Sequence, residues 1–494
     1  MGSGLALVLL VAALSVGSVF SPGFTVDIGR LPAAAEQQAK AADLNLVCPG
    51  AAYRAGGFGG DKLGEIDQIG SAEVNSIGWA RTAKVTSTEL SGPNGSAEVP
   101  ATLGIIQRMS RPTSVISADA SGKLEQGSQL LNITTLQLQG EDTFSGLLAA
   151  SCQKPATELW FVGGDTTVGR EALLIVTNPS KVDAQIDITA FANGGQVKAD
   201  GLEGLAVPAG KTLVLPLASD LINQATLALH VQATGGSVAA WLQQRVVRGT
   251  LAGGSDFIAP ATELGKNLMI PGLLLRGSAD AATIIRTRPA YADQTPMLRV
   301  FAPPIGNGSA KTFTVTAQIF GATAKTFGTV LRQTVTAGAV TDIPITGLAD
   351  GDYVAFVSAE QPIRAAIRLP RTNKAKSPAT DFAWLQAGES LAGLRAFRVP
   401  QSGVTKLSLG NSGKSEVSFE LGNPEQVLAG TAPTVKLAAG AVRTIGLTAG
   451  AMVWLKTDAT TLRANLVIDV DSAVATLPIT DYKNLPSQLL VSVR

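Results

Sequence analysis

The chain has 494 residues, of which 39 are Lys or Arg and 38 are Asp or Glu, so the formal net charge is +1. This balance argues against a nucleic-acid binder, which would carry a basic stripe, and the apolar content of 45% is too high for a disordered chain. One His and two Cys leave few side chains for metal binding or nucleophilic catalysis.

The first predicted element is an apolar segment near the N-terminus. Residues 4–20 read GLALVLLVAALSVGSVF and carry no charge. As a helix they would span about 25 Å, slightly less than a bilayer core of about 30 Å. We therefore predict a signal peptide or signal-anchor over 1–22, followed by a linker or stalk over 23–43. The protein is then exported, and it is either anchored at the outer face of the cell membrane or released to the cell wall and the medium.

Beyond the stalk, one pattern of short strands recurs four times. An apolar opening strand ends in Pro or Gly, as in LNLVCPG from Leu44 and LWFVGG from Leu159. In the last three copies an Ala-Gly pair precedes an alternating strand. The glycines of these pairs, Gly210, Gly338 and Gly440, suit turns that need a positive φ.

Each copy closes with two alternating strands around a short polar turn, which we interpret as a hairpin. Apolar residues at every second position are typical of half-buried antiparallel strands. The four copies are TTLQLQGEDTFSGLLAASC from Thr134, ATLALHVQATGGSVAAWLQQ from Ala225, DYVAFVSAEQPIRAAIRL from Asp352 and AMVWLKTDATTLRANLVI from Ala451.

These phrases predict an all-β protein of tandem immunoglobulin-like β-sandwich repeats, with about seven strands in each unit. A β-propeller is the alternative, but its blades are usually about 40–50 residues long, less than half of this period. Sandwiches in tandem often share small interfaces, so we expect an elongated, jointed rod. The predicted units are 44–155, 156–256, 257–376 and 377–494.

The two cysteines, Cys48 and Cys152, fall in the opening and the closing strand of the first unit. An even pair in an oxidising compartment favours a disulfide, and two separate buried thiols are the alternative. We expect the disulfide, because it would join the two ends of a single unit.

The third unit carries an extra stretch, DAATIIRTRPAYADQTP from Asp280, which predicts an inserted loop or an edge hairpin. Surface insertions of this kind often carry function.

No motif for catalysis or cofactor binding stands out. His230, the only histidine, alternates out of phase with its apolar neighbours and is predicted to face solvent, and one histidine cannot form a His-based zinc triad. Asp469 and Asp471 lie two positions apart, which predicts a shared, solvated strand face. The Gly-rich GGFGGDK from Gly56 lacks the ending of a phosphate loop. We therefore predict no catalytic residue, no cofactor and no metal.

The tryptophans divide into two sets. Trp79 and Trp384 lie outside the recurring phrases and are the candidates for exposed rings that stack on sugars. Trp160, Trp241 and Trp454 lie within the recurring strands, where packing in a core is expected.

Four phrases carry a family resemblance: WFVGG from Trp160, VTNP from Val176, PAG from Pro208 and LALHVQATGG from Leu227. Their order resembles that in a family of secreted or membrane-anchored actinobacterial proteins of unknown function. The resemblance covers the chain from about Leu44 onward and departs in the third unit, where APPIGNGSA replaces the Thr-Asn-Pro turn. It implies an envelope location and supplies no catalytic residue.

The sequence thus predicts a non-enzymatic, exported scaffold or binding module for an envelope protein or a wall polymer, with membrane contact through its N-terminal segment. Exposed sheet edges would offer strand addition to a partner. The alternative is a carbohydrate-binding or carbohydrate-active protein of the cell wall, marked by a row of exposed tryptophans or by two carboxylates at glycosidase spacing.

Overall fold

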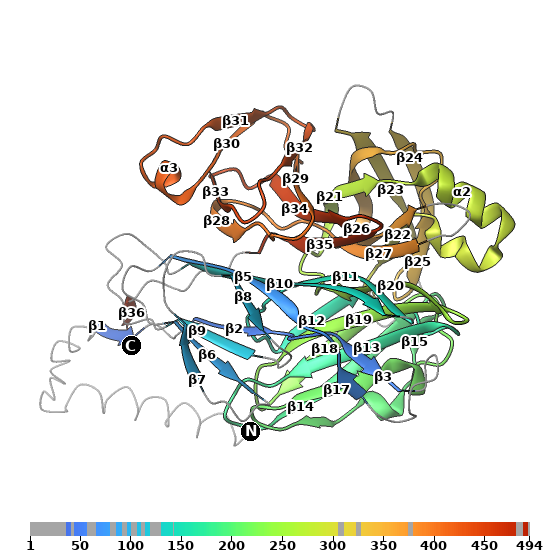
Figure 1. Ribbon diagram of the computed structural model, residues 1–494, viewed down its shortest axis with the longest axis horizontal. Helices are drawn as coiled ribbons and strands as arrows, with labels where there is room; N and C mark the ends of the chain where they lie inside the picture. The colour runs from blue at the N-terminus through green and yellow to red at the C-terminus, as the bar shows by residue number, and fades with distance from the viewer. Residues whose placement is uncertain are drawn as a thin grey trace, which may run out of the picture. The chain divides into compact units, whose positions relative to one another are not determined.

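Antiparallel strands are the main element of the protein in its computed structural model (Figure 1). The all-β prediction is confirmed, whereas the immunoglobulin-like topology stays a prediction. The segment over 1–22 lies outside the described residues, within which no helix has the length and apolar character needed to cross a membrane. The structure describes residues 36–40, 44–56, 66–79, 85–90, 96–99, 106–109, 114–118, 130–141, 143–304, 311–322, 328–373, 379–480 and 488–492.

The chain divides into two compact units, of which the larger is residues 42–485. The smaller unit joins segments near the two ends of the chain. In it, β1 (Glu36–Lys40) pairs antiparallel with β36 (Gln488–Ser492).

The first group of strands in the larger unit forms two four-stranded sheets and a short ladder. In sheet order they are β11 (Phe144–Ser151), β10 (Leu130–Glu141), β5 (Ala72–Trp79) and β8 (Ile106–Met109); β2 (Leu44–Cys48), β9 (Ser114–Ala118), β6 (Val85–Glu89) and β7 (Ser96–Val99); and β3 (Tyr53–Ala55) with β4 (Ile66–Gln68). The predicted disulfide is confirmed, because Cys48 is bonded to Cys152 directly after β11. Beside it, Val47 and Gln153 exchange two backbone hydrogen bonds of 2.8 Å, so the opening and closing strands are tied twice.

The second group forms two sheets around one apolar core. Phe161 and Ile186 from one sheet and Leu174 and Leu242 from the other belong to the same buried cluster. In sheet order the strands are β12 (Glu158–Val162), β18 (Ala228–Thr234), β14 (Ala184–Ala192) and β15 (Gly195–Val197), with β16 (Leu205–Val207) also on β14; and β17 (Thr212–Pro216), β13 (Arg170–Thr177), β19 (Ala239–Arg248) and β20 (Leu251–Ile258), with short helices η1 (Asp200–Leu202) and η2 (Leu217–Ser219).

The third group is one seven-stranded sheet built on a single long strand. Its strands are β24 (Thr329–Thr336), β23 (Thr312–Gly321), β26 (Gly351–Asn373), β22 (Met297–Phe301) and β25 (Val340–Pro344), with β21 (Gly265–Leu275) and β27 (Ala379–Gln386) also paired to β26; helices α2 (Ser278–Thr287) and η3 (Pro289–Gln294) follow β21. Strand pairing places 379–386 with this group, although the sequence placed these residues in the fourth unit.

The fourth group again forms two four-stranded sheets, with a short capped helix on one of them. The side chain of Asn423 accepts the N–H of Gln426 and so begins this helix. The elements are β28 (Gly393–Arg398), β33 (Met452–Thr457), β30 (Val417–Gly422) and β31 (Thr434–Leu437); β32 (Val442–Gly446), β29 (Val404–Asn411), β34 (Leu462–Val470) and β35 (Ala473–Pro478); and α3 (Pro424–Leu428).

The closing hairpin predicted for every copy exists only in the first group, where β10 pairs with β11. In the second group, β18 and β19 enter different sheets, as do β33 and β34 in the fourth. In the third group the two halves form the continuous strand β26. The prediction failed because alternation defines which face of a strand is buried, and a polar turn serves a crossing between sheets as well as a hairpin.

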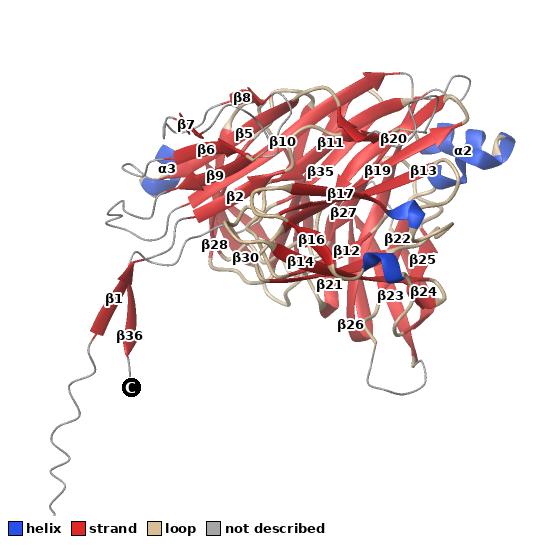
Figure 2. Ribbon diagram, turned by 90° about the horizontal axis from the view of Figure 1, so that it is seen from below, coloured by secondary structure: helices blue, strands red, loops and turns tan. Residues whose placement is uncertain are grey.

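The last strand of each group is a sheet edge, and the four edges meet in the interior. These central strands, β11, β20, β27 and β35, are in mutual contact: β11 and β27 each contact both β20 and β35 (Figure 2). They run in the same direction, because two cavities are lined by opposite ends of all four strands. Residues near the strand starts, Ser145, Ala252, Thr380 and Ala473, line one cavity, and residues at or just after the strand ends, Ser151, Ala259, Gln386 and Pro478, line the other. These four sheet edges therefore cover one another and are not open to strand addition.

The expected jointed rod is wrong, because the apolar cores cross from one group to the next. Phe382 of the third group lies in the core of the second, and Val467 of the fourth lies in the core of the third. Leu147 of the first group lies in the core of the fourth. The four groups consequently share buried surface instead of meeting at small joints.

The recurring Ala-Gly turns have the predicted backbone conformation. Gly210, Gly338 and Gly440 have φ of 66°, 83° and 66°. A β-carbon placed on Gly440 would meet no atom within 4 Å, so only the backbone conformation opposes a side chain there.

We expect Gly440→Ala to lower the free energy of unfolding by about 1 kcal/mol, because a left-handed backbone strains any residue that has a β-carbon. Gly446→Ala is the matched control, since this glycine also has open space around it but lacks a positive φ. Urea unfolding of both variants measures the difference. Equal losses from the two substitutions would contradict the assigned turn.

Candidate functional site

One buried carboxylate joins the central strands. Asp381 lies in β27, and its Oδ2 accepts the N–H of Leu147 in β11 and of Val474 in β35, both at 3.0 Å. Its Oδ1 accepts the N–H of Ser255 in β20 at 3.1 Å. Edge strands have backbone donors that no ladder pairs, and here a single side chain satisfies one donor from each of three edges.

Two glycines leave room for this contact. Gly146 and Gly254 have φ of 134° and 108°, and a β-carbon on either one would lie 2.6 Å from Oδ1 of Asp381. Any larger residue would therefore push the strands away from the carboxylate. Gly146 is the last residue of the phrase FSG in the first group, and Gly254 is the first residue of the phrase GSD in the second.

A second carboxylate lies beside the first. Asp256 in β20 is 1% exposed, and its Oδ2 accepts the N–H of Trp384 at 2.6 Å. Burial raises the pKa of Asp381 to about 7, although four backbone N–H groups oppose the rise. Burial also raises the pKa of Asp256 well above its ordinary value. The backbone N–H of Trp384 opposes this rise, and the charge of Asp381 adds to it.

Cavities lie at both ends of the central strands. The N-end cavity has a volume of about 350 Å³, and its lining includes Ser145, Asp381, Asp471 and Ser472. The C-end cavity, of about 250 Å³, lies where the same strands finish. Among the described residues, no three His, Cys, Asp or Glu side chains are grouped so that they could hold a metal ion.

The inserted stretch of the third group forms the helices α2 and η3, so the predicted loop or edge hairpin is wrong. Ala281 and Ile284 are the buried residues of α2, three positions apart and so on one face. Asp350 accepts the N–H groups of Gly277 and Ser278 at 2.9 and 2.8 Å, which places a negative charge at the start of the helix. The segment is too short for its helical period to stand out in the sequence.

The insertion is anchored by an ionic cluster around Asp293. Arg170, Arg248 and Arg368 approach its carboxylate with nitrogen–oxygen distances of 2.9, 2.5 and 3.4 Å. Burial by itself would raise the pKa of Asp293, but the three guanidinium groups outweigh burial and lower it. The arginines come from β13, β19 and β26, so the cluster ties η3 to the second and third groups.

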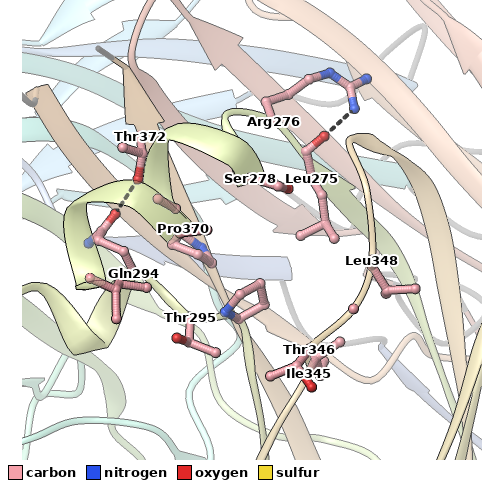
Figure 3. A pocket seen from close by; sticks show the side chains of 15 residues that line it. Leu275, Arg276, Ser278, Gln294, Thr295, Ile345, Thr346, Leu348, Pro370 and Thr372 are labelled. Carbon is pink, nitrogen blue, oxygen red and sulfur yellow. Dashed lines mark hydrogen bonds between the residues drawn. The ribbon is translucent and has the colours of Figure 1, made fainter. Parts of the chain in front are cut away.

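A groove of about 190 Å³ lies between α2 and the end of β26 (Figure 3). Three of its polar side chains, those of Thr372, Gln294 and Arg276, are already paired. Thr372 donates to Gln294 at 2.8 Å, and Arg276 contacts Asp352 at 2.5 Å. The surface left for a ligand is mainly apolar. Its lining includes Leu275, Ala281, Ile285, Pro296, Ile345, Leu348 and Pro370.

The structure separates the two tryptophans that the sequence singled out. Trp384 is 3% exposed, and its Nε1 donates to Gln244 at 2.8 Å, so the expectation of an exposed ring is wrong. It is buried because β27 is a central strand. The backbone of Trp79 ends β5 opposite Leu130, and its side chain lies outside the described part of the structure.

The single histidine is partly covered rather than solvated. The ring of His230 stacks on Trp160 with centroids 3.9 Å apart, and its Nε2 lies 3.0 Å from Oε1 of Glu158. Burial lowers the pKa of His230, and the neighbouring Glu158 carboxylate opposes this only in part. The prediction missed the stack because the covering residue belongs to the adjacent strand β12.

The sequence predicted that Asp469 and Asp471 share a strand face, and this prediction is wrong. Asp469 lies one residue before the end of β34 and forms an ion pair with Arg371. Asp471 follows the strand in a turn, with a φ of 49°. The residues that the sequence reasoning missed, Asp381 and Asp256, carry no local signal except the glycines near their contact points.

No curated protein and no solved structure matches the chain. The model of a family described as "Family of unknown function (DUF5719)" matches residues 107–468, which is more than half of the chain. The chain therefore belongs to this family of unknown function.

Proposed function

We propose that the protein is an exported, non-enzymatic scaffold of the cell envelope that holds a protein partner. The observation that carries this proposal is the junction at Asp381, where one side chain joins strands from all four groups. Buried carboxylates cost free energy unless they are well bonded, and they serve best where a fixed arrangement is needed. A protein whose four groups of strands are fixed to one another in this way can hold a partner in a constant position.

Two further observations support an exported protein with a protein partner. The disulfide between Cys48 and Cys152 fits an oxidising compartment, as does the apolar segment over 4–20. Trp241, Trp384 and Trp454 are each at most 3% exposed, so these rings are not available to stack on sugars. The carbohydrate alternative therefore lacks support from this set of aromatic side chains.

Co-sedimentation tests the proposal. The full, oxidised chain is mixed with membrane vesicles of a related bacterium, with the same vesicles after surface proteolysis, and with purified cell wall. We expect pelleting with intact vesicles that falls sharply after proteolysis, because a protein partner is digested while the lipid is unchanged. The digested vesicles also measure any contribution of the apolar N-terminal segment.

Two outcomes would overturn this function. Equal pelleting with intact and digested vesicles would show that no protein partner is involved. Pelleting with purified cell wall that survives high salt would favour the carbohydrate-binding alternative, since salt screens only the ionic part of the attraction.

A further inference from the structure

Strand β24 forms one end of the seven-stranded sheet and has an open edge. It pairs with β23, and among the described residues no other strand pairs with it. Its residues, TVLRQTVT, include no proline, pair without a register shift and carry one charged side chain, Arg332. Five of the eight residues are β-branched, which favours an extended backbone.

Proteins usually protect such edges with prolines, charges, bulges or short strands. Other edge strands of this chain carry such protection: β17 and β25 end in Pro216 and Pro344, β21 contains Pro271, β28 carries Arg395 and Arg398, and β7, β8, β15, β16 and β31 have three or four residues each. Apart from its single charge, β24 has none of these protections.

The backbone of β24 presents hydrogen-bonding groups along this edge. The N–H of Ala337 donates to the C=O of Lys311 at 2.9 Å and so continues the ladder between β24 and β23. Hydrogen-bonded pairs alternate along an antiparallel ladder, so the odd-numbered residues of β24 bond to β23 and the even-numbered residues face outward. Among the described residues, no hydrogen bond is made by the N–H and C=O of Val330 and Arg332 or by the N–H of Thr334.

These outward groups define the chemistry of the ligand. They offer a donor and an acceptor at every second residue, a pattern that the backbone of another extended chain complements. The C=O of Thr334 accepts the side chain of Gln333 at 3.2 Å, so the free part of the edge begins at the N–H of Thr334.

The outer face of β24 adds side-chain selectivity. Val330 is 56% exposed, and Phe320, two positions beyond its partner Gln318 in β23, is 43% exposed. Phe320 contacts Phe356 of β26 edge to face, with ring centroids 5.4 Å apart, so apolar surface reaches the edge. Arg332 lies on the same face as Val330, two positions further on. A matching strand therefore has an apolar side chain opposite Val330 and an acidic one opposite Arg332.

The single charge argues against a second copy of this chain as the occupant. If two copies paired antiparallel through β24 in the register with the greatest overlap, Arg332 would lie opposite Arg332 of the second copy. Sliding one strand by two residues leaves the two arginines diagonal neighbours. Like charges at these positions destabilise strand pairing.

We propose that the edge of β24 binds an extended segment of a partner protein by antiparallel strand addition, with an acidic side chain of that segment beside Arg332. This rests on the proposed function and deepens it, because it gives the place and the chemistry of the contact with the protein partner.

The test uses a synthetic peptide, Thr-Val-Thr-Thr-Glu-Val-Val-Thr, with fluorescein at its N-terminus. Fluorescence anisotropy measures its affinity for the full, oxidised protein. Antiparallel pairing places its glutamate opposite Arg332 and the second of its two adjacent valines opposite Val330. One derivative is N-methylated at these two residues, whose N–H groups would face β24. The matched derivative is N-methylated at the residue before each of them, whose N–H groups would face away.

We expect the unmodified peptide to bind. Methylation of the two inward N–H groups should weaken binding by about tenfold or more, because two hydrogen bonds are lost and the methyl groups crowd the edge. The matched derivative has the same composition and should bind within about twofold of the unmodified peptide. This comparison leaves the protein unchanged, so it does not depend on how any variant folds.

A charge exchange tests the predicted register. Arg332→Glu should weaken binding of the glutamate peptide about fivefold, and a peptide with lysine in place of the glutamate should recover the loss. Arg443→Glu is the matched control, because Arg443 is an exposed arginine in β32, another edge strand, and it should leave the affinity unchanged.

Thr334→Pro tests the edge itself. Proline removes the outward N–H of this residue and no hydrogen bond to β23, so we expect weaker binding at a melting temperature close to that of the wild type.

Three results would overturn the proposal. The wild type could fail to bind the peptide, or the two methylated derivatives could bind equally well. The wild type could also form a dimer in sedimentation velocity that Thr334→Pro abolishes, and the edge would then belong to a second copy. If vesicle pelleting falls after proteolysis but the peptide does not bind, the proposed function stands and the edge assignment is lost. The reverse result keeps β24 as a strand-binding edge and removes the envelope partner.

Discussion

Asp381→Ala is expected to lower the free energy of unfolding by about 4 kcal/mol at neutral pH. The substitution leaves the N–H groups of Leu147, Ser255 and Val474 without their acceptor. Each unsatisfied buried donor costs about 1–3 kcal/mol, and water entering from the N-end cavity recovers part of the sum. Because the donors belong to three different groups, the loss should appear in one cooperative transition. Urea unfolding followed by tryptophan fluorescence and by circular dichroism measures it.

Asp458→Ala is the matched control for this prediction. Asp458 is an exposed aspartate in the loop between β33 and β34, and such surface changes usually stay within about 0.5 kcal/mol. A loss at Asp381 no greater than that of the control would show that the junction does not brace the protein. Separate transitions for the two probes would show instead that the groups unfold independently.

Much of the local structure could be predicted from the sequence because it depends on local patterns. Alternating apolar residues identified strands in each of the four copies, and the Ala-Gly pairs identified turns whose glycines have a positive φ. The disulfide followed from the places of Cys48 and Cys152 within one repeat. In each case the physical cause lies within a few residues, or within one repeat of the pattern.

Strand partners could not be predicted, because pairing depends on contacts distant in the chain. The phrase from Asp352 reads as two strands and a polar turn, yet it forms one strand that passes through the whole third group. The phrase from Ala225 crosses between sheets for the same reason. Period-two alternation is satisfied equally well by any partner that covers the apolar face.

The candidate site was hidden because its key residues resemble ordinary surface residues. Asp381 follows a polar stretch, KAKSPAT, which reads as a loop. Its burial depends on Gly146 and Gly254, which lie more than 100 positions away and admit the carboxylate. A signal was present in the glycines, but nothing in one sequence connects them to an aspartate.

The stability of the protein should fall as the pH rises from about 4 to about 7. Burial raises the pKa of Asp381 to about 7 in the folded protein, whereas an aspartate in an unfolded chain has a pKa of about 3.9. Between these values the folded state holds a proton that the unfolded state has released. The stabilisation is therefore complete below about pH 4 and is lost as the pH approaches about 7, at about 1.4 kcal/mol per pH unit.

Asp381→Asn isolates this contribution, because the amide cannot release a proton in this range. We expect the difference in unfolding free energy between the wild type and this variant to change by about 4 kcal/mol across that range, in the direction that disfavours the wild type as the pH rises. Asp256, whose pKa is also raised, adds a slope of the same sign in both proteins, and the variant lacks only the part of that rise which comes from the charge of Asp381. Urea unfolding at a series of pH values measures the difference. A constant difference would mean that Asp381 is ionised throughout, and the three N–H donors would then outweigh its burial.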